Sequence, residues 1–513
     1  MFSRFKTELL FIVAGVAVLA VLFTMQWYDL GRKGGTNYVT TVGVPLDDVY
    51  IHCRYAENLL AGNGYSFNPP TQVTADTSPL WVVLIAFGGL FTSHLEVIAV
   101  LFSSLAWLLI APAVYRVAKY VFNFEEVWAI VAGIISILGG RMLIMAPSGM
   151  ETTLASLLTL IAVEIHIRSR DKLQIRVREA VVLGLAIATR PELYLLAAIA
   201  AIDWLILLSK NKVSVKSFAG FSVVLTVFFA AVLSLPYTER GSLSYHSSVV
   251  QGAGFRLLPD VYYLLRSFGI LVEMYAIILL LGAFEVFHFP KIRARYAILL
   301  IFIVGLPIAQ AFISPQYRHF GRYIFPIFPL CTLCVVAFVK QTKEISINGT
   351  KRMLGIRASG VHRYILCFFI ACIMVYISFR WITNYGGAVS NINDQHLAAV
   401  AWVNANLTPN DIIAADDVGA LGFFTKRNII DLTGLVSPEM YPLQHDQQLV
   451  WKAARSKGAN IFIIYTRLNP TFYQYASDSL ELVKELPVRK PLVSSADSVM
   501  SIFKVKGAHY AAR

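Results

Sequence analysis

Two adjacent aspartates, Asp47 and Asp48, are the first residues whose types and spacing could carry out chemistry. One carboxylate can take a proton from a hydroxyl, while a second carboxylate beside it orients that base or holds a cation. Either residue could instead cap a following helix, because a short carboxylate accepts hydrogen bonds from the free N–H groups of a first turn. Only one of the two can cap, so the pair predicts a site that contains a general base.

The residues after this pair could bind a cation and a phosphate. His52 lies four residues after Asp48, so on a helix the two side chains share a face and could bind a divalent cation such as Mg²⁺ or Mn²⁺. The alternative is a hydrogen bond between His52 and a nearby acid. Arg54 and Tyr55 follow, and the planar guanidinium of an arginine suits a phosphate.

The composition places these residues in a membrane protein. Of 513 residues, 57% are hydrophobic and 15% are charged, whereas an average globular chain is roughly 45–50% apolar and about 25% charged. Disordered and coiled-coil proteins are excluded on the same ground. The net charge of +13 is expected to reflect Lys and Arg gathered in cytoplasmic loops, so we predict membrane lipids, and no nucleic acid, as partners.

The apolar runs predict eleven membrane spans with the N-terminus inside. A span needs about 20 apolar residues. Residues 180–189 form a shorter run, but counting it as a crossing places the basic clusters at 210–216 and 340–363 inside, as the positive-inside rule favours. Residues 79–92 are predicted to form an interfacial helix. The other predicted spans are 8–25, 95–121, 126–145, 150–168, 192–209, 217–236, 262–288, 296–313, 322–340 and 363–382.

This topology divides the chain into a transmembrane module, residues 1–382, and an outward tail, residues 383–513. The first outward loop, residues 26–94, carries the two aspartates. In the tail, short strand-like runs alternate with helical stretches, which predicts a small α/β domain. The predicted strands are 412–416, 428–432 and 461–465, and the predicted helices are 394–406 and 446–457.

Further ionisable residues fall on the outward side of the predicted bundle. Glu151 begins the helix 150–168, where the helix dipole favours an acid, or it faces the aspartates across a cavity. Arg190 and Glu192 follow a crossing that reaches only about 15 Å, so both would lie below the surface and must pair or line a wet cavity. Arg190 therefore either pairs with Glu192 or holds a phosphate.

A second basic group lies where the chain enters the span 322–340. These residues could bind a phosphate or diphosphate, or they could anchor the helix to lipid head groups. The group comprises Arg318, His319, Arg322 and Tyr323.

The segment 47–70, followed by 77–81, resembles the first outward loop of bacterial GT-C glycosyltransferases. The pattern is most similar to that of the actinobacterial terminal arabinofuranosyltransferases and their relatives. The sequence differs from that pattern at His52 and Cys53, and the loop after residue 236 lacks the usual P-N-T. Further matching segments follow in the same order at 148–151, 189–192, 321–329, 417–424 and 430–438.

The resemblance implies a GT-C fold: a polytopic α-helical protein of the bacterial inner (plasma) membrane with an extracytoplasmic C-terminal α/β domain. It implies an inverting glycosyltransferase that moves a sugar from a polyprenyl-phosphate donor to a hydroxyl of a glycan, lipid or protein on the outward face. The alternative is a transporter or flippase of lipid-linked sugars. Such a protein would carry paired repeats and polar residues at mid-membrane, whereas this chain concentrates its polar residues in outward loops.

The resemblance also implies roles for individual residues. The base falls on Asp47 or Asp48; we prefer Asp47, with Asp48 as the helix cap or cation ligand. Glu151 is the third catalytic candidate. By residue type and location, and not by the resemblance, the residues expected to contact the donor phosphate or sugar are Arg54, Tyr55, Arg190, Glu192, His246, Arg318, His319, Arg322 and Tyr323.

Overall fold

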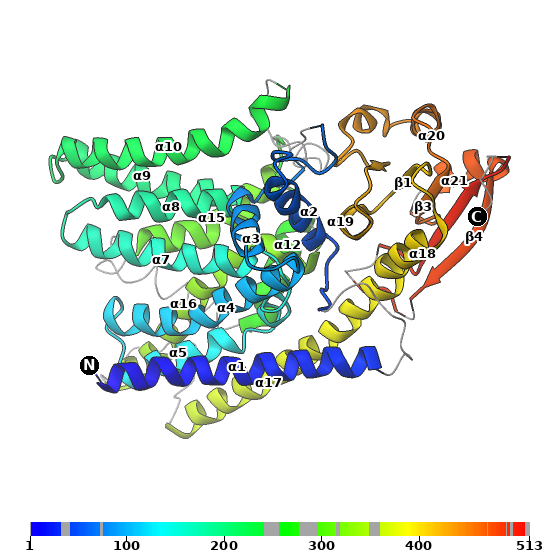
Figure 1. Cartoon of the computed structure of the whole chain (residues 1–513). Coiled ribbons are helices and arrows are strands. Elements are labelled where there is room, and N and C mark those ends of the chain that lie inside the picture. Colours follow the sequence, from blue (N-terminus) through cyan, green and yellow to red (C-terminus); the bar gives the residue numbers. More distant parts are fainter. Residues whose placement is uncertain are drawn as a thin grey trace.

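The computed structural model consists of a bundle of long helices and a small domain with a mixed β-sheet (Figure 1). Helix α1 (Phe2–Gly31) lies beside α17 (Gly360–Ile392), which leads from the bundle toward the sheet domain (Figure 1). The structure describes residues 2–31, 42–71, 75–240, 256–275, 296–313, 319–347, 360–468, 470–488, 490–492 and 496–507.

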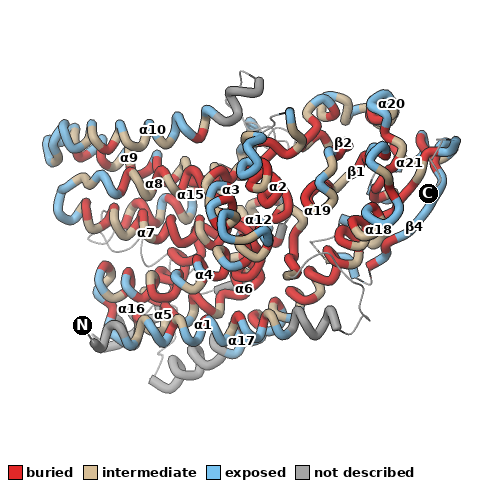
Figure 2. The backbone as a smooth tube through the Cα atoms, viewed as in Figure 1, coloured by how far each residue is buried: buried red, intermediate tan, exposed pale blue. Residues whose placement is uncertain are grey.

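Apolar sequence explains the bundle. Six helices among the described residues are long and apolar enough to cross a membrane, so the chain is a multi-pass membrane protein. The outer helices expose part of their surface (Figure 2), and their exposed positions include apolar residues such as Val223 and Val227, as expected for side chains that face lipid. Besides α1 and α17, the helices before the sheet domain are α2 (Asp48–Leu60), α3 (Pro79–Gly89), α4 (Leu95–Tyr120), α5 (Glu126–Ile137), α6 (Met142–Met145), α7 (Thr152–Asp171), α8 (Val177–Thr189), η1 (Pro191–Leu193), α9 (Tyr194–Ser209), α10 (Val215–Arg240), α12 (Val261–Tyr275), α15 (Ala297–Ile313), η2 (His319–Ile327) and α16 (Phe328–Ile347).

Each predicted span has helix at its position within the described residues, while the count of eleven spans stays a prediction. The later part of the span 262–288 lies outside the described residues. The span predicted at 126–145 is interrupted, because α5 ends at Ile137 and the chain turns at residues 138–141 before α6 begins. Helix α8 (Val177–Thr189) has 13 residues, somewhat more than the predicted run at 180–189 but still short for a span, and its C-cap, Arg190, is buried within the protein.

The C-terminal domain contains a five-stranded sheet in the order β2-β1-β3-β5-β4. The first three strands pair in parallel because helical connections separate them along the chain, and β5 and β4 add in antiparallel fashion. The three predicted strands are present at β1 (Ile413–Ala415), β2 (Ile429–Asp431) and β3 (Ile461–Ile464). The sequence did not predict β4 (Leu480–Pro487) or β5 (Val499–Val505). The helices of this domain are η3 (Asn393–Leu397), α18 (Ala398–Asn406), α19 (Gly419–Thr425), η4 (Pro438–Leu443), α20 (Gln447–Ser456), α21 (Pro470–Ala476) and η5 (Ser477–Ser479).

The bundle and the sheet domain are joined by continuous helix. Helix α17 passes through one π-helical turn, η3, directly into α18. The predicted domain boundary at residue 383 therefore falls inside α17. A helical connection transmits position and orientation better than a loop does, so α17 fixes where the sheet domain stands relative to the bundle.

We expect the C-terminal domain to lie outside the cytoplasm and the turn between α9 and α10 to lie inside. In spheroplasts, a cysteine at the exposed Lys457 should react with a membrane-impermeant maleimide, whereas one at the exposed Lys212 should react only after the membrane is opened. The exposed native Cys372 would first be replaced by serine. Equal labelling of both positions, or labelling in the reverse order, would contradict this topology.

Candidate active site

The first aspartate of the pair binds the C-terminal domain. The carboxylate of Asp47 accepts hydrogen bonds from the backbone N–H groups of Gly419 (2.7 Å) and Ala420 (2.8 Å), at the start of α19. It makes no capping bond to its own helix, α2. A side chain at Gly419 would overlap Asp47, so the close approach requires glycine. Burial raises the pKa of Asp47 to about 6, although the neighbouring His396 opposes that shift.

The contact of Asp47 belongs to a wider seam between α2 and the C-terminal domain. The ring of Tyr50 stacks on Phe423, with centroids 6.1 Å apart. Asn68 exchanges two hydrogen bonds with the backbone of Ile429, at 2.9 and 3.1 Å. Lys426 forms an ion pair with a glutamate of α2. The segment 417–424, which the sequence analysis matched to the family pattern, is thus the face of the domain that holds the first outward loop.

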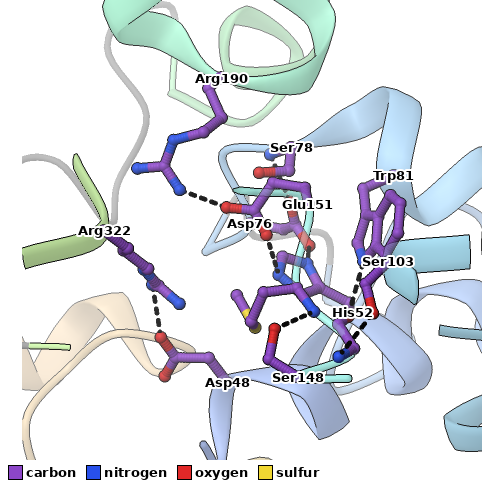
Figure 3. Close-up of polar contacts among 12 residues, drawn as sticks. Asp48, His52, Asp76, Ser78, Trp81, Ser103, Ser148, Glu151, Arg190 and Arg322 are labelled. Carbon is purple, nitrogen blue, oxygen red and sulfur yellow. Dashed lines mark hydrogen bonds and ion pairs between the residues drawn. The ribbon is translucent and has the colours of Figure 1, made fainter. Parts of the chain in front are cut away.

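The second aspartate points elsewhere, toward a buried arginine (Figure 3). Asp48 is the first residue of α2, and its carboxylate lies 2.7 Å from Nη2 of Arg322. The expectation that Asp48 caps α2 is therefore wrong. The Asp48 side chain is 29% exposed, whereas that of Arg322 is 8% exposed. Within the described part of the chain, Nε and Nη1 of Arg322 have no hydrogen-bond partner.

Arg190 is already neutralised by two acids. Its guanidinium forms ion pairs with Glu192 and with Glu151, and all three side chains are buried or nearly so. The sequence left open whether Arg190 pairs with Glu192 or holds a phosphate; the structure has the pairing and adds Glu151 to it. The ring of Tyr323 lies 4.9 Å from the guanidinium carbon of Arg190 and 5.4 Å from that of Arg322. Both arginines therefore flank one aromatic ring.

His52 joins Glu151 to a further acid that the sequence analysis did not single out. Its Nδ1 bonds the fully buried Asp76, and its Nε2 lies 3.3 Å from Glu151 Oε2 (Figure 3). Burial alone would lower the pKa of His52, but the two carboxylates raise it to about 10. Asp76 also accepts a hydrogen bond from the backbone N–H of Ser78, just before the proline that starts α3. The position of Asp76, in the turn just before this helix, was the feature of the sequence that could have identified it.

The predicted cation site of Asp48 and His52 does not form as a pair. Asp48 and His52 lie on one face of α2, but their side chains have different partners: Asp48 contacts Arg322, whereas His52 contacts Asp76 and Glu151 (Figure 3). Over the residues that the structure describes, no group of three or more His, Cys, Asp or Glu side chains is arranged to hold a metal ion. The two ring nitrogens of His52 thus lie against two buried acids, Asp76 and Glu151, where a cation was expected.

Two residues expected to contact the donor instead form hydrogen bonds within the first loop, and Arg54 also donates to the backbone oxygen of Lys426 in the C-terminal domain (3.4 Å). Arg54 donates to Glu57 (2.8 Å) and to the backbone oxygen of Phe67 (3.2 Å). The hydroxyl of Tyr55 accepts from the backbone N–H of Ala75 at 3.0 Å. Neither contact involves Asp48 or Arg322. Of the remaining predicted residues, His246 and Arg318 lie outside the described residues, as does the side chain of His319.

The chain is similar to solved structures along nearly its full length. ArnT from Cupriavidus metallidurans bound to undecaprenyl phosphate is 11% identical, with 96% of this chain and 98% of that chain covered and a TM-score of 0.58. The apo form of that protein is 12% identical, with 95% and 97% covered and a TM-score of 0.57. The oligosaccharyltransferase AglB from Archaeoglobus fulgidus, in complex with an inhibitory peptide and a dolichol-phosphate, is 12% identical, with 90% and 70% covered and a TM-score of 0.56.

These proteins are GT-C glycosyltransferases, so the predicted GT-C fold is confirmed. At such low identities the similarity establishes the fold, and the narrower resemblance to arabinofuranosyltransferases stays a prediction. Residues 390–503 match a family model described as a domain of unknown function (DUF8728). No curated protein matches the chain.

The protonated state of His52 should make stability depend on pH. Because the folded protein raises the pKa of His52 from 6.5 to about 10, its contribution to the free energy of unfolding is complete below about pH 6.5 and is lost as the pH rises toward about 10. The variant His52→Gln should melt at a lower temperature near neutral pH and lose less stability over that range. Melting curves of the purified protein measure both.

The matched control is His94→Gln. This histidine also lies near a glutamate, 3.5 Å from Glu96, but its side chain is 57% exposed. Its variant should keep the wild-type melting temperature and pH profile. If His52→Gln shows the wild-type decline with pH, the imidazolium at position 52 does not contribute to folding.

Proposed function

We propose that this chain, which has the GT-C fold, is a glycosyltransferase that uses a polyprenyl-phosphate-linked sugar on the outward side of the membrane. One observation carries the proposal: the first outward loop brings a partly exposed acid, Asp48, against a buried arginine, Arg322, that has unused N–H groups. The acid can take a proton and the arginine can hold a phosphate. Glycosyl transfer needs both functions: a base for the acceptor hydroxyl, whose oxygen forms the new bond to the sugar, and a cation for the phosphate that leaves.

The donor phosphate is assigned to Arg322. Unpartnered N–H groups on a buried guanidinium are unfavourable, and a phosphate oxygen would satisfy them with charge-assisted hydrogen bonds. Arg190 is the poorer choice because Glu151 and Glu192 already neutralise it. Support for a lipid phosphate comes from the neighbours in fold, since ArnT was solved with undecaprenyl phosphate and AglB with a dolichol-phosphate.

The general base is assigned to Asp48, in place of the Asp47 that the sequence analysis preferred. Both carboxylate oxygens of Asp47 accept backbone hydrogen bonds from α19, so that side chain is committed to the seam. In the proposed step, Asp48 takes the proton of the acceptor hydroxyl as the acceptor oxygen bonds to the anomeric carbon. The bond from that carbon to the phosphate oxygen breaks with inversion, and Arg322 stabilises the polyprenyl phosphate that leaves.

Glu151 has a supporting part in this proposal. Among the described residues, its ion pairs are with His52 and Arg190 and not with Arg322, the partner of Asp48. We therefore assign Glu151 and Glu192 to positioning Arg190 and, through the ring of Tyr323, the neighbouring Arg322. A divalent cation at Asp48 stays a prediction, because it would have to displace Arg322. Two further points stay predictions: the acceptor, whether glycan, lipid or protein, and the location in a bacterial inner membrane. The alternative of a transporter has no counterpart among the structural neighbours named above.

Replacement of each aspartate by asparagine should affect a different property, turnover for Asp48 and stability for Asp47. Asp48→Asn should lower turnover of a polyprenyl-phosphate sugar by ~10²–10⁴-fold while the melting temperature stays near that of the wild type. Asp47→Asn removes one of two carboxylate oxygens at the start of α19 and should cost about 0.5–2 kcal/mol of stability. Turnover by the purified variants and their melting curves decide. Full turnover by Asp48→Asn, or loss of turnover without loss of stability in Asp47→Asn, would contradict the assignment.

The two buried arginines should differ in donor binding. Arg322→Lys keeps the charge but loses the planar group, so affinity for undecaprenyl phosphate should fall at least roughly tenfold, which corresponds to about 1.4 kcal/mol. Arg190→Lys should mainly lower the melting temperature, because the loss falls on its pairs with Glu151 and Glu192. Titration of the detergent-purified proteins with the lipid measures affinity. An equal or larger loss of affinity in Arg190→Lys would place the phosphate at Arg190.

A further inference from the structure

Arg322 is aimed by an unusual backbone turn. The two residues before it, Phe320 and Gly321, both lie in the left-handed region, with φ of 62° and 76°. Glycine adopts this conformation without cost, but a residue with a side chain does so only when its surroundings compensate. The ring of Phe320 is buried, at 3% exposure. Something must therefore hold the backbone at Phe320.

Arg141 supplies that hold. Its Nη1 donates to the backbone oxygen of Phe320 at 3.0 Å, while its Nε and Nη2 donate to Glu273 at 3.1 and 2.6 Å. Its guanidinium carbon lies 4.6 Å from the centre of the Trp381 ring, and the indole N–H of Trp381 donates to Glu273 at 2.9 Å. One planar cation thus uses all three nitrogens and one face at once, which a lysine could not do.

The chain around Arg141 is itself fixed by α17. Three residues on one face of that helix contact the segment 138–147. Ser378 donates to the backbone oxygen of Leu138 at 2.7 Å, Trp381 stacks on Arg141, and the hydroxyl of Tyr385 lies 3.4 Å from the backbone oxygen of Pro147. Their spacing of three and four residues places them along one side of the helix. Arg141 is therefore held against α17, the helix that continues into the C-terminal domain.

We propose that Arg141 is a positioning residue for Arg322: it holds the left-handed turn at Phe320 and so directs the Arg322 guanidinium toward Asp48 and the donor phosphate. The part about the phosphate rests on the function proposed above. Arg141 also ties that turn to α17, which carries the domain that binds Asp47. Helix α17 therefore positions both the arginine that binds the donor and the loop that bears the base.

The test compares Arg141→Lys with Arg380→Met. Lysine keeps a positive charge for Glu273 but cannot also reach the Phe320 oxygen with a planar fork. Arg380 is a matched control, since it lies 3.9 Å from the same Glu273, is 58% exposed and, among the described residues, forms no hydrogen bond or ion pair with residues 319–323. We expect Arg141→Lys to bind undecaprenyl phosphate at least roughly tenfold more weakly and to raise the KM for the donor. Its kcat at saturating donor should stay near that of the wild type, and Arg380→Met should match the wild type throughout.

A measurement without donor separates this inference from the proposed function. Hydrogen exchange of the peptide containing residues 319–323 should be faster in Arg141→Lys than in the wild type or Arg380→Met, because the turn is released. In the double variant with Phe320→Gly, glycine removes the strain, so part of the lost donor affinity should return. Wild-type exchange in Arg141→Lys would overturn the positioning role, whether or not the protein binds a polyprenyl phosphate. Failure of the wild type to bind the lipid would instead overturn the proposed function.

A variant that leaves Arg141 in place covers the case in which Arg141→Lys does not fold. Glu273→Gln weakens the anchor of Arg141 while keeping a hydrogen-bond acceptor for it. A smaller increase in exchange at residues 319–323 is then expected. Exchange at the wild-type level in this variant would overturn the proposal as well.

Discussion

The arrangement of the site follows from one constraint, which is that charges buried at the outward end of a membrane bundle must be paired. Successive ion pairs connect five buried or nearly buried side chains whose charges alternate in sign: Asp76, His52, Glu151, Arg190 and Glu192. Isolated, each of these groups would be strongly unfavourable in a buried place, and removal of one partner leaves another uncompensated. These ion pairs connect the first outward loop to the starts of α7 and η1. Pairing of the buried charges therefore also fixes the positions of these segments.

The same constraint explains why two adjacent aspartates have different surroundings. Because neighbouring side chains at the start of a helix diverge, Asp47 faces the C-terminal domain while Asp48 faces Arg322. The N-terminus of α19 neutralises the first with two backbone N–H groups and the favourable end of a helix dipole. The second is neutralised by a side chain that can exchange partners. A fixed partner suits a structural contact, whereas an exchangeable one suits a group that must change its charge.

Much of this could be predicted from sequence because it depends on local pattern. Apolar runs gave the positions of the helices, the ten-residue run at 180–189 gave the buried depth of Arg190, and the three buried strands were visible as short apolar segments. Strand β4 was not predicted, since it exposes most of its residues and reads as polar. Strand β5 was also missed, although most of its residues are buried. The Asp47 contact and the roles of Asp76 and Arg141 depend on residues that are far apart in sequence. No spacing rule reports a partner 372 positions away.

The charge balance of the proposed reaction supports Asp48 and Arg322 as a unit. Before transfer, the single positive charge of Arg322 is shared between Asp48 and a phosphodiester that carries one negative charge. As the bond to the sugar breaks, the leaving phosphate gains a second negative charge while Asp48 becomes neutral on taking the acceptor proton. Arg322 can then give its full charge to the phosphate, and the total charge of the site does not change. In a buried place where net charge is costly, a base that releases its own counterion at the moment the leaving group needs it lowers the barrier without a further cation. Asp47 could not act in this way, because its partners are backbone N–H groups that cannot move to the phosphate.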